Sequence, residues 1–259
     1  LLAFMPAALF AQEKWDLKRC VDYALEHNIS VKVADVQART DALQKKAAKA
    51  LTVPTLSFNT NAGVNFGRSI DPTSNQFTTQ QILFQGLGVN SGITLFNWNN
   101  IRNQIMAVNT TAEASMIGIE RAKNDISLNV AASYLTLLQS IEQVNIAKVQ
   151  IEQTSVQLAN ARKLVEAGSK PELDAVQLAA QLATDSSTYV TAISTADQNK
   201  ISLMALLNLD LSVPFEVSVP DVDKIPLEPL SELHPGTLYK EALVTQPLQK
   251  QNELIIKSQ

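Results

Sequence analysis

Hydrophobic and polar residues alternate with a period of two through much of the segment 52–97. Apolar side chains occupy even positions from Thr55 to Gly67, and odd positions after the turn-rich residues 69–75. This alternation is typical of a strand with one apolar and one polar face, so we expect a hairpin of two long strands. The positions expected on the apolar face are Leu56, Phe58, Val64, Phe66, Leu83, Leu87, Val89, Ile93 and Leu95.

The same segment is almost free of charge. Between residues 52 and 101 the sole charged side chains are Arg68 and Asp71, in the expected exposed loop near 68–77. A hairpin in water normally carries charges on its wet face, whereas Ser, Thr, Asn and Gly form the polar face here. An outer-membrane strand has this pattern, with its apolar face toward lipid and small polar residues toward a wet lumen. We therefore predict a transmembrane β-hairpin over 52–97, with a soluble hairpin as the alternative.

A helical pattern replaces the alternation after residue 97. The segment from Trp98 to Glu166 contains no proline and one glycine, Gly118. As a single helix it would be about 100 Å long, which is far beyond a globular helix. Apolar residues form two rows along it, which indicates neighbours on two sides, as in a ring of helices. The first row runs from Ile101 through Ile126 to Val165, and the second comprises Leu128, Leu135, Leu138, Ile146, Val149 and Val156.

A turn and a second helix follow the long helix. Gly168 suits a left-handed helix cap, and Pro171 suits the start of the next helix, expected over 171–208. Region 98–209 is thus predicted to be a long helical hairpin with its tip at 165–174. Charged residues gather at this tip, either as a solvated helix end or as a gating or docking network. They are Arg162, Lys163, Glu166, Lys170, Glu172 and Asp174.

Shorter elements lie on both sides of these regions. Two helices are expected within 12–51, one over 15–28 and one over 29–51, with Asn28 between them. Five of the ten prolines lie in 210–235, which predicts an irregular segment. The residues from Ala242 then align with those from Ala24 at a constant offset, so 236–259 is interpreted as the start of a second repeat.

The first eleven residues form an apolar run that ends in Phe-Ala. We interpret 1–11 as the remnant of a secretory signal peptide cleaved after Ala11, which implies export. A frayed apolar N-terminus is the alternative. Cys20 is the single cysteine, so an internal disulfide is excluded. Charged residues precede it, unlike a lipoprotein anchor site, and we expect it to be a buried helix residue.

The sequence contains no motif that indicates catalysis, metal binding or nucleotide binding. His27 and His234 do not have metal-ligand spacing. The glycines of 86–92 superficially suggest a dinucleotide loop, but strand alternation continues where a helix would have to begin. A net charge of −4 gives no electrostatic case for nucleic acid. We expect no catalytic, cofactor-binding or metal-binding residues, and no enzyme activity.

This order of elements resembles the TolC-like outer-membrane efflux family over essentially 15–259. The local matches are residues 16–28, the segment Thr94–Asn97 that closes the second strand, and Val165–Asp174, where Gly168 and Asp174 have the family's spacing. The loop 67–72 is similar to members from Bacteroidetes-type bacteria. The family's turn often has Val-Gly-Leu where this chain has Ala-Gly-Ser, a departure that leaves the identity of the adaptor open.

The resemblance implies a mainly α fold with a transmembrane β-hairpin. The helical hairpin would belong to a trimeric α-barrel in the periplasm, joined to a shared 12-stranded outer-membrane β-barrel. The implied partners are two further copies, outer-membrane lipid, an inner-membrane pump and a periplasmic adaptor. That adaptor would dock on Val165, Ala167, Gly168, Ser169 and Lys170. The implied function is the exit duct of a tripartite efflux pump. A channel for type I protein secretion is one alternative, and a soluble coiled-coil scaffold or adhesin rod is another.

Overall fold

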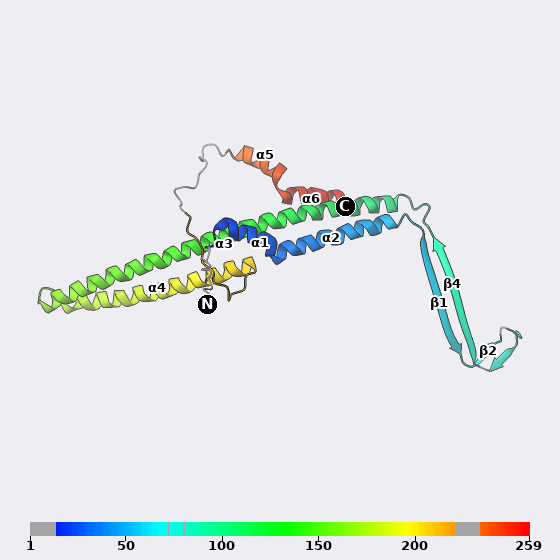
Figure 1. The fold of residues 1–259 in the computed structure, drawn as a ribbon, viewed down its shortest axis with the longest axis horizontal. Coiled ribbons are helices and arrows are strands. Elements are labelled where there is room, and N and C mark those ends of the chain that lie inside the picture. The colour runs from blue at the N-terminus through cyan, green and yellow to red at the C-terminus, as the bar shows by residue number, and fades with distance from the viewer. Residues whose placement is uncertain (1–13, 72, 80, 221–233) are drawn as a thin grey trace, which may run out of the picture. The chain divides into compact units, whose positions relative to one another are not determined.

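The computed structural model describes residues 14–71, 73–79, 81–220 and 234–259. The expected signal remnant, 1–11, lies outside these ranges. The chain is mainly helical with a small antiparallel hairpin, as predicted (Figure 1). It divides into two units. The first unit comprises residues 1–37 and 116–250, and the second comprises 38–115 and 251–259.

The second unit contains the strand hairpin. Strand β1 (Thr55–Asn65) pairs antiparallel with β4 (Ile82–Gly92), and each has 11 residues. Phe58 lies opposite Val89, and Val64 lies opposite Leu83. Directly opposed residues share a face of the sheet. The register therefore places the apolar even positions of β1 and the apolar odd positions of β4 on one face.

Both strands are shorter than the alternating pattern predicts. Phe66 follows the end of β1, and Ile93 and Leu95 follow the end of β4, so these three residues are not in the paired strands. Continued pairing would set Ile93 against Pro54, which has no N–H to donate. At the other end Gly67 adopts a φ of 112°, which turns the chain after Phe66.

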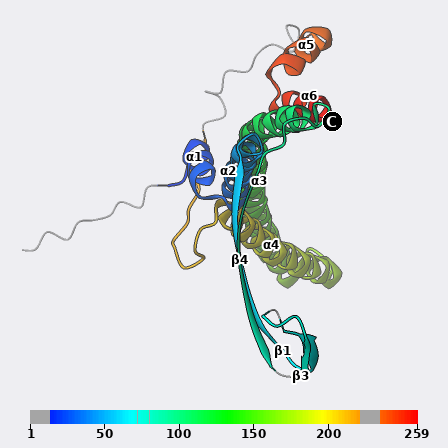
Figure 2. The same cartoon turned by 90° about the vertical axis from the view of Figure 1, so that its right-hand side faces the viewer.

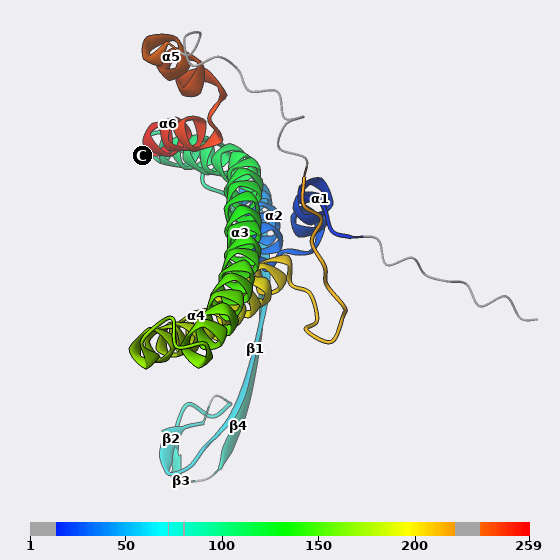
Figure 3. The same ribbon diagram turned by 90° about the vertical axis from the view of Figure 1, so that its left-hand side faces the viewer.

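The expected exposed loop near 68–77 is partly strand. Strand β2 (Arg68–Ile70) pairs with β3 (Phe77–Thr79), so a small second hairpin lies beyond the end of β1 (Figure 3). Its connecting turn includes Asp71, whose carboxylate accepts hydrogen bonds from the backbone N–H and the hydroxyl of Thr73. These bonds lower the pKa of Asp71.

The long helix α3 runs from Asn100 to Glu166, over 67 residues, where the sequence pattern predicts a helix from 98. Trp98 and Asn99 have φ values of 53° and 62°, so the left-handed conformation at these residues delays the start. In the second unit the later part of α2 (Ile29–Ala50) lies beside the start of α3 (Figures 1 and 2). Four alanines in these two segments are buried: Ala38, Ala48, Ala112 and Ala114.

The first unit is organised around a buried apolar cluster. It joins α1 (Leu17–His27), the middle of α3 and the end of α4 (Glu172–Leu207). Its fully buried members include Cys20, Val130, Tyr134, Leu203 and Leu207. The expected burial of Cys20 is confirmed, and burial raises the pKa of its thiol to about 12. The thiol therefore stays protonated and unreactive.

Two extended segments, around Trp15 and Val217, pair with each other next to this cluster. Trp15 and Val217 form a parallel β-bridge, in which the Trp15 N–H donates to Glu216 O at 2.8 Å and the Ser218 N–H donates to Trp15 O at 2.9 Å. The Tyr134 hydroxyl, from α3, lies within hydrogen-bond distance of the Trp15 and Ser218 carbonyl oxygens. One buried side chain therefore holds two segments that are far apart in the sequence.

Asn28 joins three helices at one point. Its N–H donates to Ala24 O at the end of α1, and its Oδ1 accepts from the Ser30 N–H at the start of α2. Its Nδ2 donates to Leu206 O at the end of α4, at 2.8 Å. The expected role of Asn28 between the first two helices is confirmed, and the link to α4 is an addition.

The last two helices repeat the first two. Helix α5 (Pro235–Thr245) has 11 residues, like α1, and α6 (Pro247–Ser258) begins two residues after α5 ends, as α2 does after α1. The equivalent linking residues, Asn28 and Gln246, are both extended and donate to Ala24 O and Ala242 O. Helix α5 and the residue that links it to α6 therefore match α1 and Asn28 at the offset read from the sequence.

The helices within the described ranges include none with a stretch apolar enough, over enough residues, to cross a lipid bilayer.

Replacing Tyr134 by Phe should destabilise the first unit. Tyr134 is 1% exposed, and loss of its hydroxyl removes a hydrogen-bond donor from two carbonyl oxygens. We expect a loss of about 1 to 2 kcal/mol in the free energy of unfolding, measured as a lower urea midpoint of the helical signal. Tyr189→Phe is the control, because the Tyr189 hydroxyl makes no hydrogen bond within the described residues. An equal effect of both variants would contradict this role.

Candidate functional site

The apolar face of the β1–β4 hairpin is fully open in this chain. Six of the nine side chains predicted to face lipid lie on it, and they are 45–78% exposed. They are Leu56, Phe58, Val64, Leu83, Leu87 and Val89. Three polar residues, Thr60, Gln85 and Ser91, interrupt the face, and each lies opposite an apolar partner. An exposed apolar face of this extent requires a partner or a lipid environment.

The opposite face is polar and lined with small residues. Asn59 lies opposite Gly88, and Asn61 lies opposite Gly86. The Asn61 carboxamide occupies the space that a side chain at position 86 would need, since an added Cβ would lie 2.4 Å from Asn61 Oδ1. This face therefore presents amides and backbone rather than charge.

Phe84 is an exception on the polar face that the alternation did not predict. Its ring lies over Gly63, the residue directly opposite, so that an added Cβ at position 63 would be 2.5 Å from the ring. An aromatic ring that covers a cross-strand glycine compensates for its missing side chain. This pair depends on which residues of β1 and β4 lie opposite each other, and the sequence alone does not determine that register.

The hairpin has the dimensions of a membrane span. An 11-residue strand is about 37 Å long, and at a tilt of about 45° it spans roughly 25 Å. This equals the height of the apolar band of an outer-membrane barrel.

Aromatic residues lie beyond both ends of the paired strands. Phe96 and Trp98 follow β4, with ring centroids 5.7 Å apart in an edge-to-face arrangement. Phe66 and Phe77 lie at the other end, and all four side chains are exposed. Aromatic girdles at both membrane interfaces are typical of outer-membrane barrels.

The tip of the helical hairpin is a compact turn. Gly168 has a φ of 71°. Its N–H donates to Val165 O at 2.9 Å, and the Ser169 N–H donates to Leu164 O at 2.8 Å. These two bonds define a Schellman motif, which satisfies carbonyl groups at the end of α3. The predicted cap at Gly168 is confirmed. Helix α4 begins at Glu172, so Pro171 is its N-cap rather than its first residue.

The five residues predicted to contact an adaptor lie together in this turn. Val165 is partly buried, whereas Ala167, Gly168, Ser169 and Lys170 are exposed. Lys170 and Asp174 form an ion pair at 3.4 Å, which contributes little at this exposure. A shallow groove of about 270 Å³ lies next to the turn. It is lined by Arg162, Val165, Glu166, Glu172, Ala175, Val176 and Ala179.

A buried polar cluster joins α3 to α4, and the sequence pattern does not predict it. Asp185 is 8% exposed and Thr154 is 2% exposed. The Thr154 hydroxyl donates to Asp185 Oδ2 at 2.6 Å, and Gln181 Nε2 donates to Asp185 Oδ1 at 2.8 Å. Hydrogen bonds from Thr154 and then Gln181 lower the pKa of Asp185. The pair of Thr154 and Asp185 fixes how the two helices align beyond the tip.

The buried face of α4 is not its most apolar face. Leu173, Val176 and Val190, which the periodicity assigns to the apolar face, are each more than half exposed, whereas Asp185 and Ala192 are buried. The second apolar row of α3 is likewise largely exposed, as at Leu128 and Val156. Both helices therefore retain apolar surface that this chain does not cover.

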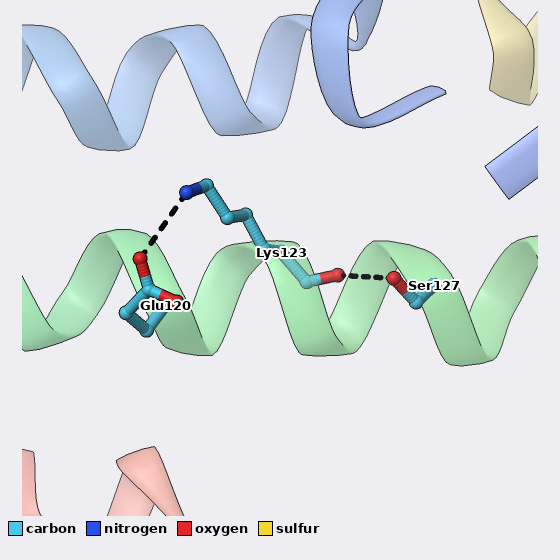
Figure 4. Close-up of polar contacts among 3 residues, drawn as sticks. All are labelled: Glu120, Lys123 and Ser127. Carbon is cyan, nitrogen blue, oxygen red and sulfur yellow. Dashed lines mark hydrogen bonds and ion pairs between the residues drawn. The ribbon is translucent and has the colours of Figure 1, made fainter. Parts of the chain in front are cut away.

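Further along the hairpin, α3 and α4 enclose a polar groove of about 490 Å³. The Thr188, Thr191 and Thr195 hydroxyls of its α4 wall donate to carbonyl oxygens four residues earlier in their own helix. Ser127 does the same with Lys123 O in α3, beside the exposed Lys123–Glu120 ion pair (Figure 4). The threonine hydroxyls of the α4 wall therefore bond within their own helix, whereas the amides of Gln139, Gln143 and Asn199 also line the groove.

Acidic, His and Cys side chains do not gather into a group able to hold a metal ion anywhere in the described ranges.

Comparisons with known proteins agree with this geometry. The model of the family described as outer membrane efflux protein matches residues 20–209. A search of curated proteins finds no match.

Several solved structures are similar to the chain. One, of CusC, has 17% identity and a TM-score of 0.76, with 97% of this chain and 57% of that chain covered. The Campylobacter jejuni CmeC outer membrane channel has 19% identity and a TM-score of 0.72, with 93% and 51% covered. The open Neisseria gonorrhoeae MtrE channel has 18% identity and a TM-score of 0.67, with 93% and 52% covered. This chain thus spans a little over half the length of these proteins, and the likeness shows the fold.

Replacing Gly168 by Val should destabilise the tip. A φ of 71° is unfavourable for any side chain by about 1 to 2 kcal/mol, and a β-branched residue fits worst. We expect faster protease cleavage at the turn and a lower unfolding midpoint. Ala167→Val is the matched control, because it adds the same side chain at the neighbouring residue, which does not have a positive φ. Equal cleavage of the two variants would show that the left-handed cap is unimportant.

The Asp185 cluster should make the helical hairpin sensitive to acid. The folded pKa is below the unfolded value of about 3.9. The contribution is therefore fully present above that value and is lost as the pH falls through the lowered pKa. Asp185→Asn should lose stability at pH 7 and respond less to acid than the wild type, measured as the urea midpoint from pH 7 to pH 3. Asp197→Asn, at an exposed position of the same helix, should keep the wild-type profile, and an altered profile there would point to general charge.

Proposed function

The chain belongs to the outer membrane efflux protein family, and from this premise we propose that it is the first half of an outer-membrane exit duct for small molecules. Three copies assemble into the duct. Each copy contributes the β1–β4 hairpin and a second hairpin from its second repeat to a shared 12-stranded barrel. The helices extend into the periplasm and form the wall of a tunnel. The duct carries out no chemistry, and an inner-membrane pump supplies the energy.

The observation that carries this proposal is that the apolar residues of β1 and those of β4 lie on the same face of the hairpin. Six apolar side chains from β1 and β4 share one exposed face. The opposite face is lined by Asn and Gly, and the strands are long enough to cross the membrane. A barrel with lipid outside and water inside accounts for both faces at once.

The uncovered apolar surface of the helices supports the assembly. Exposed apolar residues on α3 and α4, such as Leu135 and Val190, would be covered by neighbouring helices in a closed ring. The repeat of α1 and α2 in α5 and α6 supports a second copy of the same architecture. A soluble scaffold would leave both the family match and the apolar strand face without an explanation.

The turn around Gly168 is the proposed docking point for the periplasmic adaptor. It is a compact, exposed reversal with a defined backbone, and Val165 and Val176 provide apolar surface in the adjacent groove. A helical hairpin of a partner could meet this turn end to end. The residues proposed for contact are Val165, Ala167, Gly168, Ser169 and Lys170.

Arginine substitutions on the two faces of β4 test the proposal. Val89→Arg places a charge on the proposed lipid face, which costs about 2 to 4 kcal/mol near the middle of a bilayer. Asn90→Arg, the adjacent control, places the same charge on the lumen face. We expect Val89→Arg to reduce the amount of heat-modifiable trimer in outer membranes, and Asn90→Arg to assemble normally. Equal assembly, or a wild-type protein that dissolves without detergent, would refute the membrane-spanning hairpin.

A further inference from the structure

Arg68 is the cationic residue at the β2–β3 end of the strand hairpin. The nearest acidic residue in the sequence, Asp71, is occupied by Thr73. Arg68 forms no ion pair within the described residues, and its guanidinium lies over the Phe77 ring, 4.8 Å from the centroid. The Arg68 side chain stacks on an aromatic ring, and its charge has no counter-ion among the residues that the structure describes.

The surroundings of Arg68 are apolar and exposed. In the β2–β3 register Arg68 lies opposite Thr79 and Ile70 lies opposite Phe77, so all four residues share one face. Ile70 and Phe77 are 52% and 66% exposed. We call Arg68, Ile70 and Phe77 the Arg68 patch. An apolar surface that carries a single cation matches the boundary between acyl chains and headgroups.

The position along the chain agrees with such a boundary. Strand β1 ends at Asn65, after a length that fills an apolar band of about 25 Å. Phe66 follows at the edge of the band, and Gly67 then turns the chain into β2. In a hairpin that spans the membrane, Arg68 would therefore come at the height where lipid phosphates lie.

We propose that the Arg68 patch binds a phosphate-bearing, anionic lipid headgroup in the leaflet around this end of the barrel. A guanidinium can offer two parallel N–H donors to phosphate oxygens, which an ammonium cannot. Stacking on Phe77 keeps the guanidinium edge available and reduces the entropy lost on binding. Ile70 and Phe77 contact the adjoining acyl chains. This inference rests on the proposed membrane-spanning hairpin.

The experiment compares lipid retained by the full-length trimer. The protein is placed in bilayers of equal parts phosphatidylglycerol and phosphatidylcholine and extracted with mild detergent, and the bound lipids are quantified by mass spectrometry. We expect the wild type to be enriched in phosphatidylglycerol. Arg68→Gln should lose about fivefold of this enrichment, because one cation near an anionic membrane contributes about that factor. Arg68→Lys should keep an intermediate level, since it retains charge without the planar fork.

A control variant separates the effect of the Arg68 patch from the effect of removing any positive charge. Lys148→Gln removes an exposed cation from α3 and should leave the enrichment unchanged. Equal losses for Arg68→Gln and Lys148→Gln would overturn the inference. The inference would also fail if Arg68→Gln prevented trimer assembly and Arg68→Lys restored it without any anionic lipid preference. That result would assign Arg68 to a contact between protomers.

Further outcomes separate a lipid site from a free-anion site, and the Arg68 patch from the proposed function. If inorganic phosphate in pure phosphatidylcholine bilayers abolished a difference in trimer melting between wild type and Arg68→Gln, the site would bind a free anion rather than a lipid. A wild-type protein that never inserts into bilayers would refute the proposed function. One that inserts and forms trimers without enrichment would refute the Arg68 patch alone.

Discussion

A helix of 67 residues cannot cover its own apolar surface, and this constraint determines how the rest of the chain is arranged. Helix α3 is about 100 Å long. In the first unit α4 lies along it, and in the second unit the later part of α2 does. Where α4 ends, the buried cluster around Tyr134 and Leu203 holds α1 and the extended segment 215–218. The apolar residues still exposed on α3 mark the surface that this chain leaves for others.

Helix pairing is specified by polar contacts as much as by apolar ones. Two small features set the geometry of the helical hairpin: the left-handed residue at Gly168 and the hydrogen bond from Thr154 to Asp185. The first reverses the chain, and the second fixes the alignment of the helices some way beyond the reversal. A buried carboxylate satisfied by neutral donors tolerates few other alignments, since any shift would leave it without partners.

The sequence predicts a structural feature best where that feature depends on neighbouring residues alone. Period-two alternation assigned the faces of β1 and β4 correctly, because the pattern depends on neighbouring residues alone. The strand ends were missed at Phe66, Ile93 and Leu95, since they depend on what Pro54 and Gly67 do to the backbone. The buried face of α4 was also missed. Periodicity counts every apolar residue, including those such as Val176 that are not covered within this chain, and it overlooks Asp185 and Ala192.

The bridge between Trp15 and Val217 has a consequence for the order of folding. Its partners are separated by about two hundred residues, and contacts of such long range form late because the intervening chain must first be ordered. The segment around Trp15 is synthesised early, yet the Trp15 N–H has no partner until residue 216 has followed it. We therefore expect the helices that bring the two segments together to order before the bridge closes.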